Sequence, residues 1–203
     1  MNAIYLASAS PRRLELLASI GLRVTVVPSR YDEPHDSKLA PRDLAMRHAG
    51  EKLKEVADRL GAPVDRPLIA ADTVVDRDGV ALNKPQDRAE ACAMLESLSG
   101  REHEVHTAVS LLLPEVREPI SFCETTRVRF HVLSSDEINT YVATGESFDK
   151  AGGYGIQGQA SALVASIEGD FYTVMGLPLG RVVRTLRAYG YALSPHAGTL
   201  RAL

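Results

Sequence analysis

The chain has 203 residues, of which 45% are hydrophobic and 24% charged, and its formal net charge is −3. This charge excludes a broad basic surface for nucleic acid, but a local cluster of cations could still bind a ligand with a few phosphates. The start lacks the basic region and long apolar run of a signal peptide, and no apolar run approaches the roughly 18 residues of a membrane span. We therefore expect a cytoplasmic protein with no nucleic-acid or membrane partner.

The first elements alternate between strand and helix. Residues 3–7 form a short apolar run that predicts a buried strand. Ser10 can cap a helix that starts at Pro11 and stops at Gly21, because serine and proline favour a helix start and glycine a helix end. Residues 23–27 predict a second strand.

Longer elements follow an acidic stretch at residues 31–36. A helix is expected over residues 41–60, ending near a glycine. Residues 68–75 predict a buried strand that ends in polar residues, with a turn at 76–79. Residues 87–98 predict another helix.

Two long strands are expected next, at residues 106–113 and 121–133. His103 and His106 belong to this region and are expected to be strand or turn residues rather than catalytic groups. Ser134 and Glu137 then form the pattern of a capping box, which predicts a helix over residues 135–144.

The remaining chain begins with a glycine-dense loop at residues 151–159. Residues 162–174 predict a strand, a turn and a strand, and residues 178–190 the final helix. Because strands and helices mix throughout, the expected class is α/β with a mixed, elongated sheet and two lobes around a cleft. We predict one domain over residues 1–190 and a C-terminal tail over 191–203, whose weak periodicity suggests mobility.

The segment SASPRR places two positive charges where a helix N-terminus is already positive. Arg12 and Arg13 would each cost roughly 0.3–1 kcal/mol there if uncompensated. With the hydroxyls of Ser8 and Ser10 they could bind an anion such as phosphate. The alternative is a solvated arginine pair, tied to Glu15.

Other polar residues allow several roles. Asp72 lies at the end of an apolar strand, where it could bind a divalent metal, act as a general base on water or cap a turn. A metal site would need further oxygens, for which Asp32 and Glu33 are candidates, although they could equally form an acidic surface loop. Lys52 and Lys84 could reach a phosphate or remain solvated.

The glycine loop could approach a ligand closely, because glycine tolerates unusual backbone angles. Within it Gln157 offers a donor and an acceptor that could read the edge of a base. Just before it, Asp149 and Lys150 could pair with each other.

In their order, these segments resemble the Maf family of nucleoside triphosphate pyrophosphatases over residues 4 to about 190. The segments that carry the resemblance are SASPRR (8–13), DE (32–33), EK (51–52), ADTVV (71–75), NKP (83–85), SGREHEVHTAV (99–109), FDKAGGYGIQG (148–158) and GLPL (176–179). The resemblance implies an elongated mixed sheet with a deep cleft, like that of inosine triphosphate pyrophosphatases, and a homodimer. It also implies cleavage of a nucleoside triphosphate between the α and β phosphates with a divalent cation (Mg²⁺, Mn²⁺ or Co²⁺).

The resemblance assigns roles to individual positions. Asp72 matches the proposed proton acceptor, and Glu33 an acidic position that places the metal with it. The positions matching the phosphate grip are Ser8, Arg13, Lys52 and Lys84, and those tied to substrate choice are Arg12, Thr73 and Gln157.

The last three positions are similar to the dTTP/UTP branch of the family. Two other functions stay open at this point: a 7-methyl-GTP pyrophosphatase, and a nucleotide-binding regulator of septum formation in which catalysis is incidental.

Overall fold

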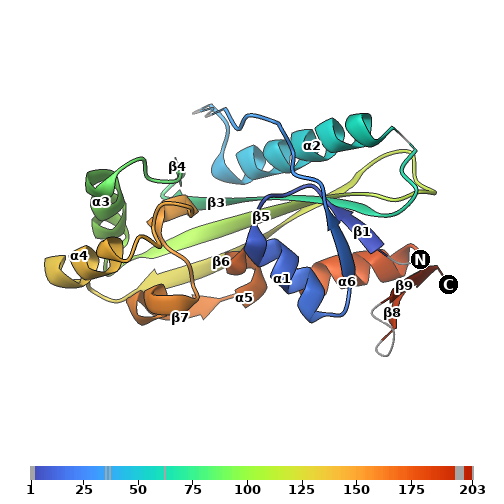
Figure 1. Ribbon diagram of the computed structural model, residues 1–203. Helices are drawn as coiled ribbons and strands as arrows, with labels where there is room; N and C mark the ends of the chain where they lie inside the picture. The colour runs from blue at the N-terminus through green and yellow to red at the C-terminus, as the bar shows by residue number, and fades with distance from the viewer. Residues whose placement is uncertain (1–2, 35, 37, 62, 195–198, 203) are drawn as a thin grey trace.

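An elongated mixed sheet runs the length of the molecule and carries helices on both faces (Figure 1). The computed structural model describes residues 3–34, 36, 38–61, 63–194 and 199–202. The sheet strands are β1 (Ala3–Leu6), β2 (Arg23–Val26), β3 (Leu68–Arg77), β4 (Val80–Leu82), β5 (Glu102–Leu112), β6 (Ile120–Phe130) and β7 (Val164–Glu168). Their order is β2-β1-β3-β5-β6-β7, with β4 paired to β3. The first three lie parallel and the other pairings are antiparallel, which confirms the mixed α/β class.

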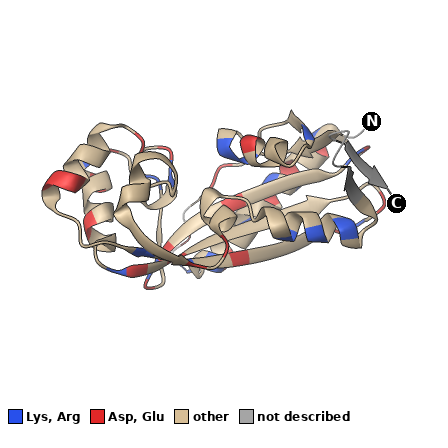
Figure 2. Cartoon of the chain, turned by 90° about the horizontal axis from the view of Figure 1, so that it is seen from below, with Lys and Arg blue, Asp and Glu red and all other residues tan. Residues whose placement is uncertain are grey.

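The helices cover different parts of this sheet. They are α1 (Pro11–Ser19), α2 (Pro41–Leu60), α3 (Arg88–Leu98), α4 (Ser135–Ala143), α5 (Phe171–Met175) and α6 (Leu179–Ala188), with short 3₁₀ turns η1 (Ala151–Gly153) and η2 (Gly158–Leu163). Helix α2 lies on one face and α1 and α6 on the other, while α3 and α4 gather at the far end of the long strands (Figure 1). A second view shows the molecule as two lobes joined by strands, one with α3 and α4 and the other with α1, α2 and α6 (Figure 2).

The apolar core follows this division. One cluster joins α1 and α6 to the sheet, with Ile4, Leu17 and Leu111 fully buried. A second cluster, which includes Leu95 and Phe130, fills the lobe of α3 and α4. Helix α2 packs on the opposite face because its apolar residues recur at helical spacing.

The strand pairing leaves a notch along one edge of β3. Strand β1 pairs with β3 only up to Ile69, and β4 begins to pair at Val75. Among the described strands, residues 70–74 therefore have a strand neighbour only on the β5 side. Side chains that point to opposite faces of a strand can both reach such a gap, which explains how Asp72 and Thr73 come to line one pocket.

Two local predictions were wrong. Residues 171–174 form part of helix α5 rather than a strand, because Asp170 caps the helix by accepting from the Thr173 N–H and Gly176 ends it with φ +105°. Ser10 occupies the N-cap position of α1, but its hydroxyl makes no capping bond. The capping box of Ser134 and Glu137 is confirmed at α4.

The tail contains two further strands, β8 (Tyr191–Ser194) and β9 (Thr199–Ala202), which pair antiparallel apart from the main sheet. The described helices include none with the length and apolarity needed to cross a membrane.

Candidate active site

A pocket of about 360 Å³ lies at the notch of β3, between the two lobes. Its walls come from the β1–α1 loop, α1, the β2–α2 loop, α2, β3, β5, the β4–α3 loop, the glycine loop with the residues just before it, and α5. All nine residues to which the family resemblance assigns a role line it, namely Ser8, Arg12, Arg13, Glu33, Lys52, Asp72, Thr73, Lys84 and Gln157. Asp32, the other acidic candidate for a metal site, is not among the lining residues. Residues up to about 150 positions apart thus share one cavity.

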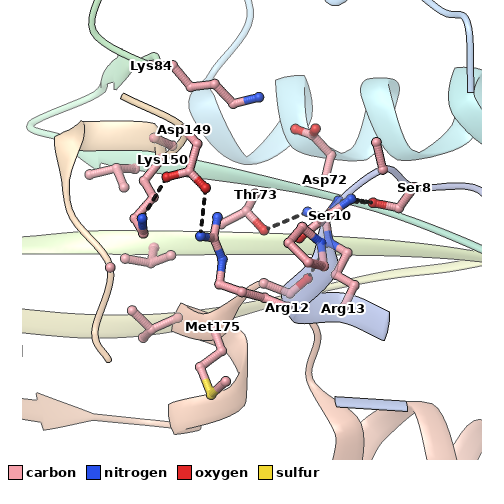
Figure 3. A pocket seen from close by; sticks show the side chains of 18 of the residues that line it. Ser8, Ser10, Arg12, Arg13, Asp72, Thr73, Lys84, Asp149, Lys150 and Met175 are labelled. Carbon is pink, nitrogen blue, oxygen red and sulfur yellow. Dashed lines mark hydrogen bonds and ion pairs between the residues drawn. The ribbon is translucent and has the colours of Figure 1, made fainter. Parts of the chain in front are cut away.

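Arg13 is the buried cation of the α1 side. Its Nε donates to the carbonyl oxygen of Gly176 at 2.8 Å, and its two Nη atoms donate to Ser8 Oγ at 3.0 Å and Thr73 Oγ1 at 3.1 Å (Figure 3). Burial lowers the pKa of Arg13 from its ordinary value, and the negative charges of Asp72 and Glu33 oppose that effect. The guanidinium is therefore fixed in place by bonds to three separate segments.

Thr73 is itself held by a chain of hydroxyl groups. Its Oγ1 lies 3.0 Å from Thr107 Oγ1, which donates to the Thr173 carbonyl oxygen at 2.6 Å. Because the Thr107 and Thr173 side chains are fully buried, this chain ties Arg13 to β5 and α5.

The opposite wall carries two carboxylates around one ammonium group. Lys52 Nζ, from α2, lies 2.6 Å from Asp72 Oδ1 on β3 and 2.6 Å from Glu33 Oε1. Desolvation alone would raise the pKa of Glu33, but the charge and hydrogen bond of Lys52 outweigh it and lower the pKa. Glu33 is thus ionised at neutral pH.

This geometry fits a divalent cation. Two carboxylate oxygens from separate segments converge on one positively charged atom, Nζ of Lys52, so they converge on a position where a cation is stable. Mg²⁺ typically binds through one or two carboxylates and completes its shell with water and phosphate oxygens. Asp72 and Glu33 supply such a pair.

The outer rim holds its charges less tightly. Arg12 Nη1 makes an ion pair at 3.0 Å with Asp149 Oδ2 (Figure 3). The other carboxylate oxygen of Asp149, Oδ1, lies 2.6 Å from Lys150 Nζ. The partner of Arg12 is therefore Asp149 rather than Glu15, and the predicted pairing of Asp149 with Lys150 is confirmed. Desolvation would raise the pKa of Asp149, but these cations lower it.

The pocket also has an apolar part. Val75, Val105, Ile156 and Met175 line it together with Tyr154. The Tyr154 hydroxyl lies 2.6 Å from Nε2 of the buried His103 on β5, which fixes the ring. A planar group such as a nucleobase could pack against these side chains.

Sequence reasoning missed several lining residues. Tyr31 lines the pocket and its hydroxyl lies 3.2 Å from Nδ1 of the buried His48. Asp149 was expected only to pair with Lys150, and Gly176 entered only as part of the GLPL segment, with no role for its carbonyl. A charged pair beside the glycine loop could have pointed to the rim.

The fold and the pocket define a class: an α/β protein whose sheet edge opens into a cavity with cationic and carboxylate walls, suited to an anionic ligand. The chain belongs to the Maf family, because the family model described as Maf-like protein matches residues 3–189.

Its relatives include a dTTP/UTP pyrophosphatase of Carboxydothermus hydrogenoformans, 49% identical over 93% of this chain and 99% of that protein. Proteins of the same name from Methylobacillus flagellatus and Bacillus velezensis are 48% and 44% identical, covering 95% and 92% of this chain and 96% of each relative. Among solved structures, the Ham1 protein of Staphylococcus aureus aligns at 13% identity with a TM-score of 0.40, covering 63% of this chain and 71% of that one.

Proposed function

We propose that this protein hydrolyses dTTP and UTP to the nucleoside monophosphate and pyrophosphate. The observation that carries the proposal is the pocket, which combines three buried or bridging charges, Arg13, Lys52 and Asp72, with an apolar part. The names of relatives 42–49% identical over most of the chain support the same substrates. The reaction class and the substrates thus have independent support.

The triphosphate would bind to the cationic groups. Three of the guanidinium N–H groups of Arg13 are used by Gly176, Ser8 and Thr73 among the described residues. Since a guanidinium has five N–H donors, one remains on each Nη for phosphate oxygens. Lys84 lines the same cavity and adds a second cation. Because the Arg13 donors are already fixed, little reorganisation of this group is needed as charge develops on the leaving group.

Asp72 would orient a water molecule and accept its proton. The water oxygen bonds to the α phosphorus, the bond from that phosphorus to the bridging oxygen breaks, and pyrophosphate leaves. Asp72 is suited to the task because it is buried and held by Lys52 at 2.6 Å. A divalent cation held by Asp72 and Glu33 would supply Lewis-acid polarisation of the phosphate oxygens.

Base choice would depend on the rim. Arg12 lies at the partly exposed rim, Gln157 lies in the glycine loop, and Thr73 lines the same pocket and accepts a hydrogen bond from Arg13. These positions also match those tied to substrate choice in the family resemblance, which favours the pyrimidine branch over the 7-methyl-GTP branch.

The test is a nucleotide panel with product identification. Purified protein with Mg²⁺ or Mn²⁺ is given dTTP, UTP, CTP and 7-methyl-GTP, and released pyrophosphate and orthophosphate are measured separately. We expect pyrophosphate and the monophosphate from dTTP and UTP. Release of orthophosphate, or faster turnover of 7-methyl-GTP, would contradict the proposal.

A homodimer and a cytoplasmic location are proposals that the family resemblance supports. Sedimentation velocity over a range of protein concentrations tests the dimer, and a species of about 22 kDa at all concentrations, the mass of one chain, would contradict it.

A further inference from the structure

Outside the pocket, three potential metal ligands meet at the far end of β3 and β5. They are Asp76, Glu104 and His106, and one ligand atom from each lies within 4.8 Å of the others. His106 Nε2 is 3.2 Å from Asp76 Oδ2 and 3.7 Å from Glu104 Oε2. Asp76 and Glu104 are directly paired across the two strands, so the sheet register itself brings them together.

Neighbouring groups orient these ligands. His106 Nδ1 lies 2.8 Å from Thr125 Oγ1 on β6, and Asp76 Oδ1 accepts from the Gly79 N–H at 2.7 Å. When Nδ1–H donates to Thr125, the lone pair of Nε2 faces the two carboxylates. Ligating histidines commonly donate their second ring N–H in this way, which fixes the ring and the tautomer.

The charge balance of the cluster calls for a cation. Asp76 and Glu104 have no lysine or arginine within 4.0 Å in the described part of the chain, and their ion-pair contact is His106. Arg127, which faces Glu104 across the strands, pairs with Glu168 instead. The His106 side chain is only 4% exposed, so water screens the two carboxylates poorly on that side.

The spacing also suits a metal ion. Four-coordinate zinc with bonds of about 2.0–2.1 Å sets neighbouring ligand atoms roughly 3.3 Å apart. The observed 3.2 and 3.7 Å are close to that value. One imidazole with two carboxylates favours Zn²⁺, Co²⁺, Mn²⁺ or Ni²⁺ over Mg²⁺ and Ca²⁺, which bind oxygen ligands. The half-exposed Glu104 leaves the site open to solvent for entry and for a water ligand.

We propose that Asp76, Glu104 and His106 form a second metal site, for a transition-metal ion, distinct from the pocket of Asp72 and Glu33. Asp76 lies at the base of the β3–β4 hairpin, and Lys84 follows β4 by two residues. A bound ion would tie this hairpin to β5 and so steady the loop that carries Lys84 into the pocket. The proposed site has a structural role and takes no part in catalysis.

The experiment separates the two sites by removing the pocket carboxylates. In a full-length Glu33→Gln/Asp72→Asn background, we expect one Zn²⁺ per chain by isothermal titration and, with Co²⁺, visible absorption bands of nitrogen and oxygen coordination. Adding His106→Gln should abolish both signals, and adding Glu104→Gln should weaken Zn²⁺ binding by at least about tenfold. Glu102→Gln, the same charge change on the same strand, should bind normally.

Three outcomes would overturn the proposal. Absence of Zn²⁺ and Co²⁺ binding in the background variant would mean that His106 holds the two carboxylates without a metal ion. Unchanged binding in the His106→Gln or Glu104→Gln variant, or equal loss in the Glu102→Gln variant, would place the ion elsewhere. Circular dichroism of the metal-free variants checks that each is folded. Because binding is measured without turnover, failure here leaves the proposed hydrolysis untouched, and failure of the hydrolysis leaves this site untouched.

Discussion

The inner and outer parts of the pocket hold their charges in different ways. Inside, Arg13, Lys52 and Asp72 are each less than 10% exposed and each is bonded to groups from other elements. At the rim, the Arg12 and Asp149 side chains are 28% and 60% exposed and share one ion pair. The inner groups are therefore pre-organised, whereas the rim pair can exchange for a ligand at little cost. Substitutions inside should change both turnover and stability, and those at the rim chiefly which ligand is accepted.

The largest effect is expected at the proposed proton acceptor. Asp72→Asn keeps the size of the side chain and an oxygen that can accept from Lys52, so the fold should survive. Loss of the base should lower kcat for dTTP by about 10²–10⁴-fold. Turnover assays and a thermal melt measure the two effects, and Asp58→Asn on the exposed side of α2 is the matched control. Near wild-type turnover would remove Asp72 from the mechanism.

Arg13 tests whether the inner site depends on its fixed geometry as well as its charge. Lysine keeps the charge but cannot make the three bonds to Gly176, Ser8 and Thr73. Leaving such buried partners unpaired should cost about 2–4 kcal/mol of unfolding free energy. We expect Arg13→Lys to show that loss in urea melts together with at least about 10²-fold lower kcat/KM.

The control for Arg13 is the neighbouring position. Arg12→Lys should change stability by less than about 1 kcal/mol, as is usual for an exposed ion pair. Equal stability losses in the two variants would erase the distinction between inner site and rim.

His103 is a buried residue that contacts Tyr154 of the pocket, and it makes the stability of the fold depend on pH. Burial lowers the pKa of His103 from its ordinary 6.5 to about 4. At pH values between these two, His103 is protonated in the unfolded chain but not in the folded chain. The free energy of unfolding therefore falls as the pH drops from about 6.5 to about 4. Since one pKa unit corresponds to about 1.4 kcal/mol, the full loss is about 3 kcal/mol.

His103→Gln removes this titration and retains an acceptor for Tyr154. Its stability curve should therefore be flatter than wild type across that pH window in chemical melts. His131→Gln, at an exposed histidine just after β6, should follow the wild-type curve. A His103→Gln curve parallel to wild type would contradict a neutral buried His103.

How well each element could be predicted from the sequence depends on how local its signals are. Elements with local signals were predicted well, such as α4 with its capping box and α2 with its helical spacing. Helix α5 was wrongly predicted as a strand, because its residues favour β structure and this signal outweighed the capping residue Asp170 and the helix end at Gly176. Local sequence signals can determine the type of a long element, but whether a five-residue segment is helix or strand depends on its tertiary contacts.

The candidate site follows the same rule. The nine residues to which the family resemblance assigned a role all line the cavity, because the resemblance carried their convergence, which no local pattern could supply. Asp32, a candidate from the residues alone, does not line it. The notch of β3 depends on where β1 and β4 stop pairing, so it could not be derived from the strand patterns alone. The bond from Arg12 to Asp149 joins residues 137 positions apart, and a sequence offers no direct measure of such a contact.

The smallest expected effect lies at that rim contact. Arg12→Ala removes a cation that is partly exposed and tied only to Asp149 among the described residues, so stability should change by less than about 1 kcal/mol. If Arg12 reads the base, the ratio of kcat/KM for dTTP to that for CTP should shift while the rate with the best substrate falls only a few-fold. Asp149→Asn, which frees Arg12 without removing it, should leave that ratio in place. An equal loss on every nucleotide would instead make Arg12 a phosphate ligand and assign it to the inner site.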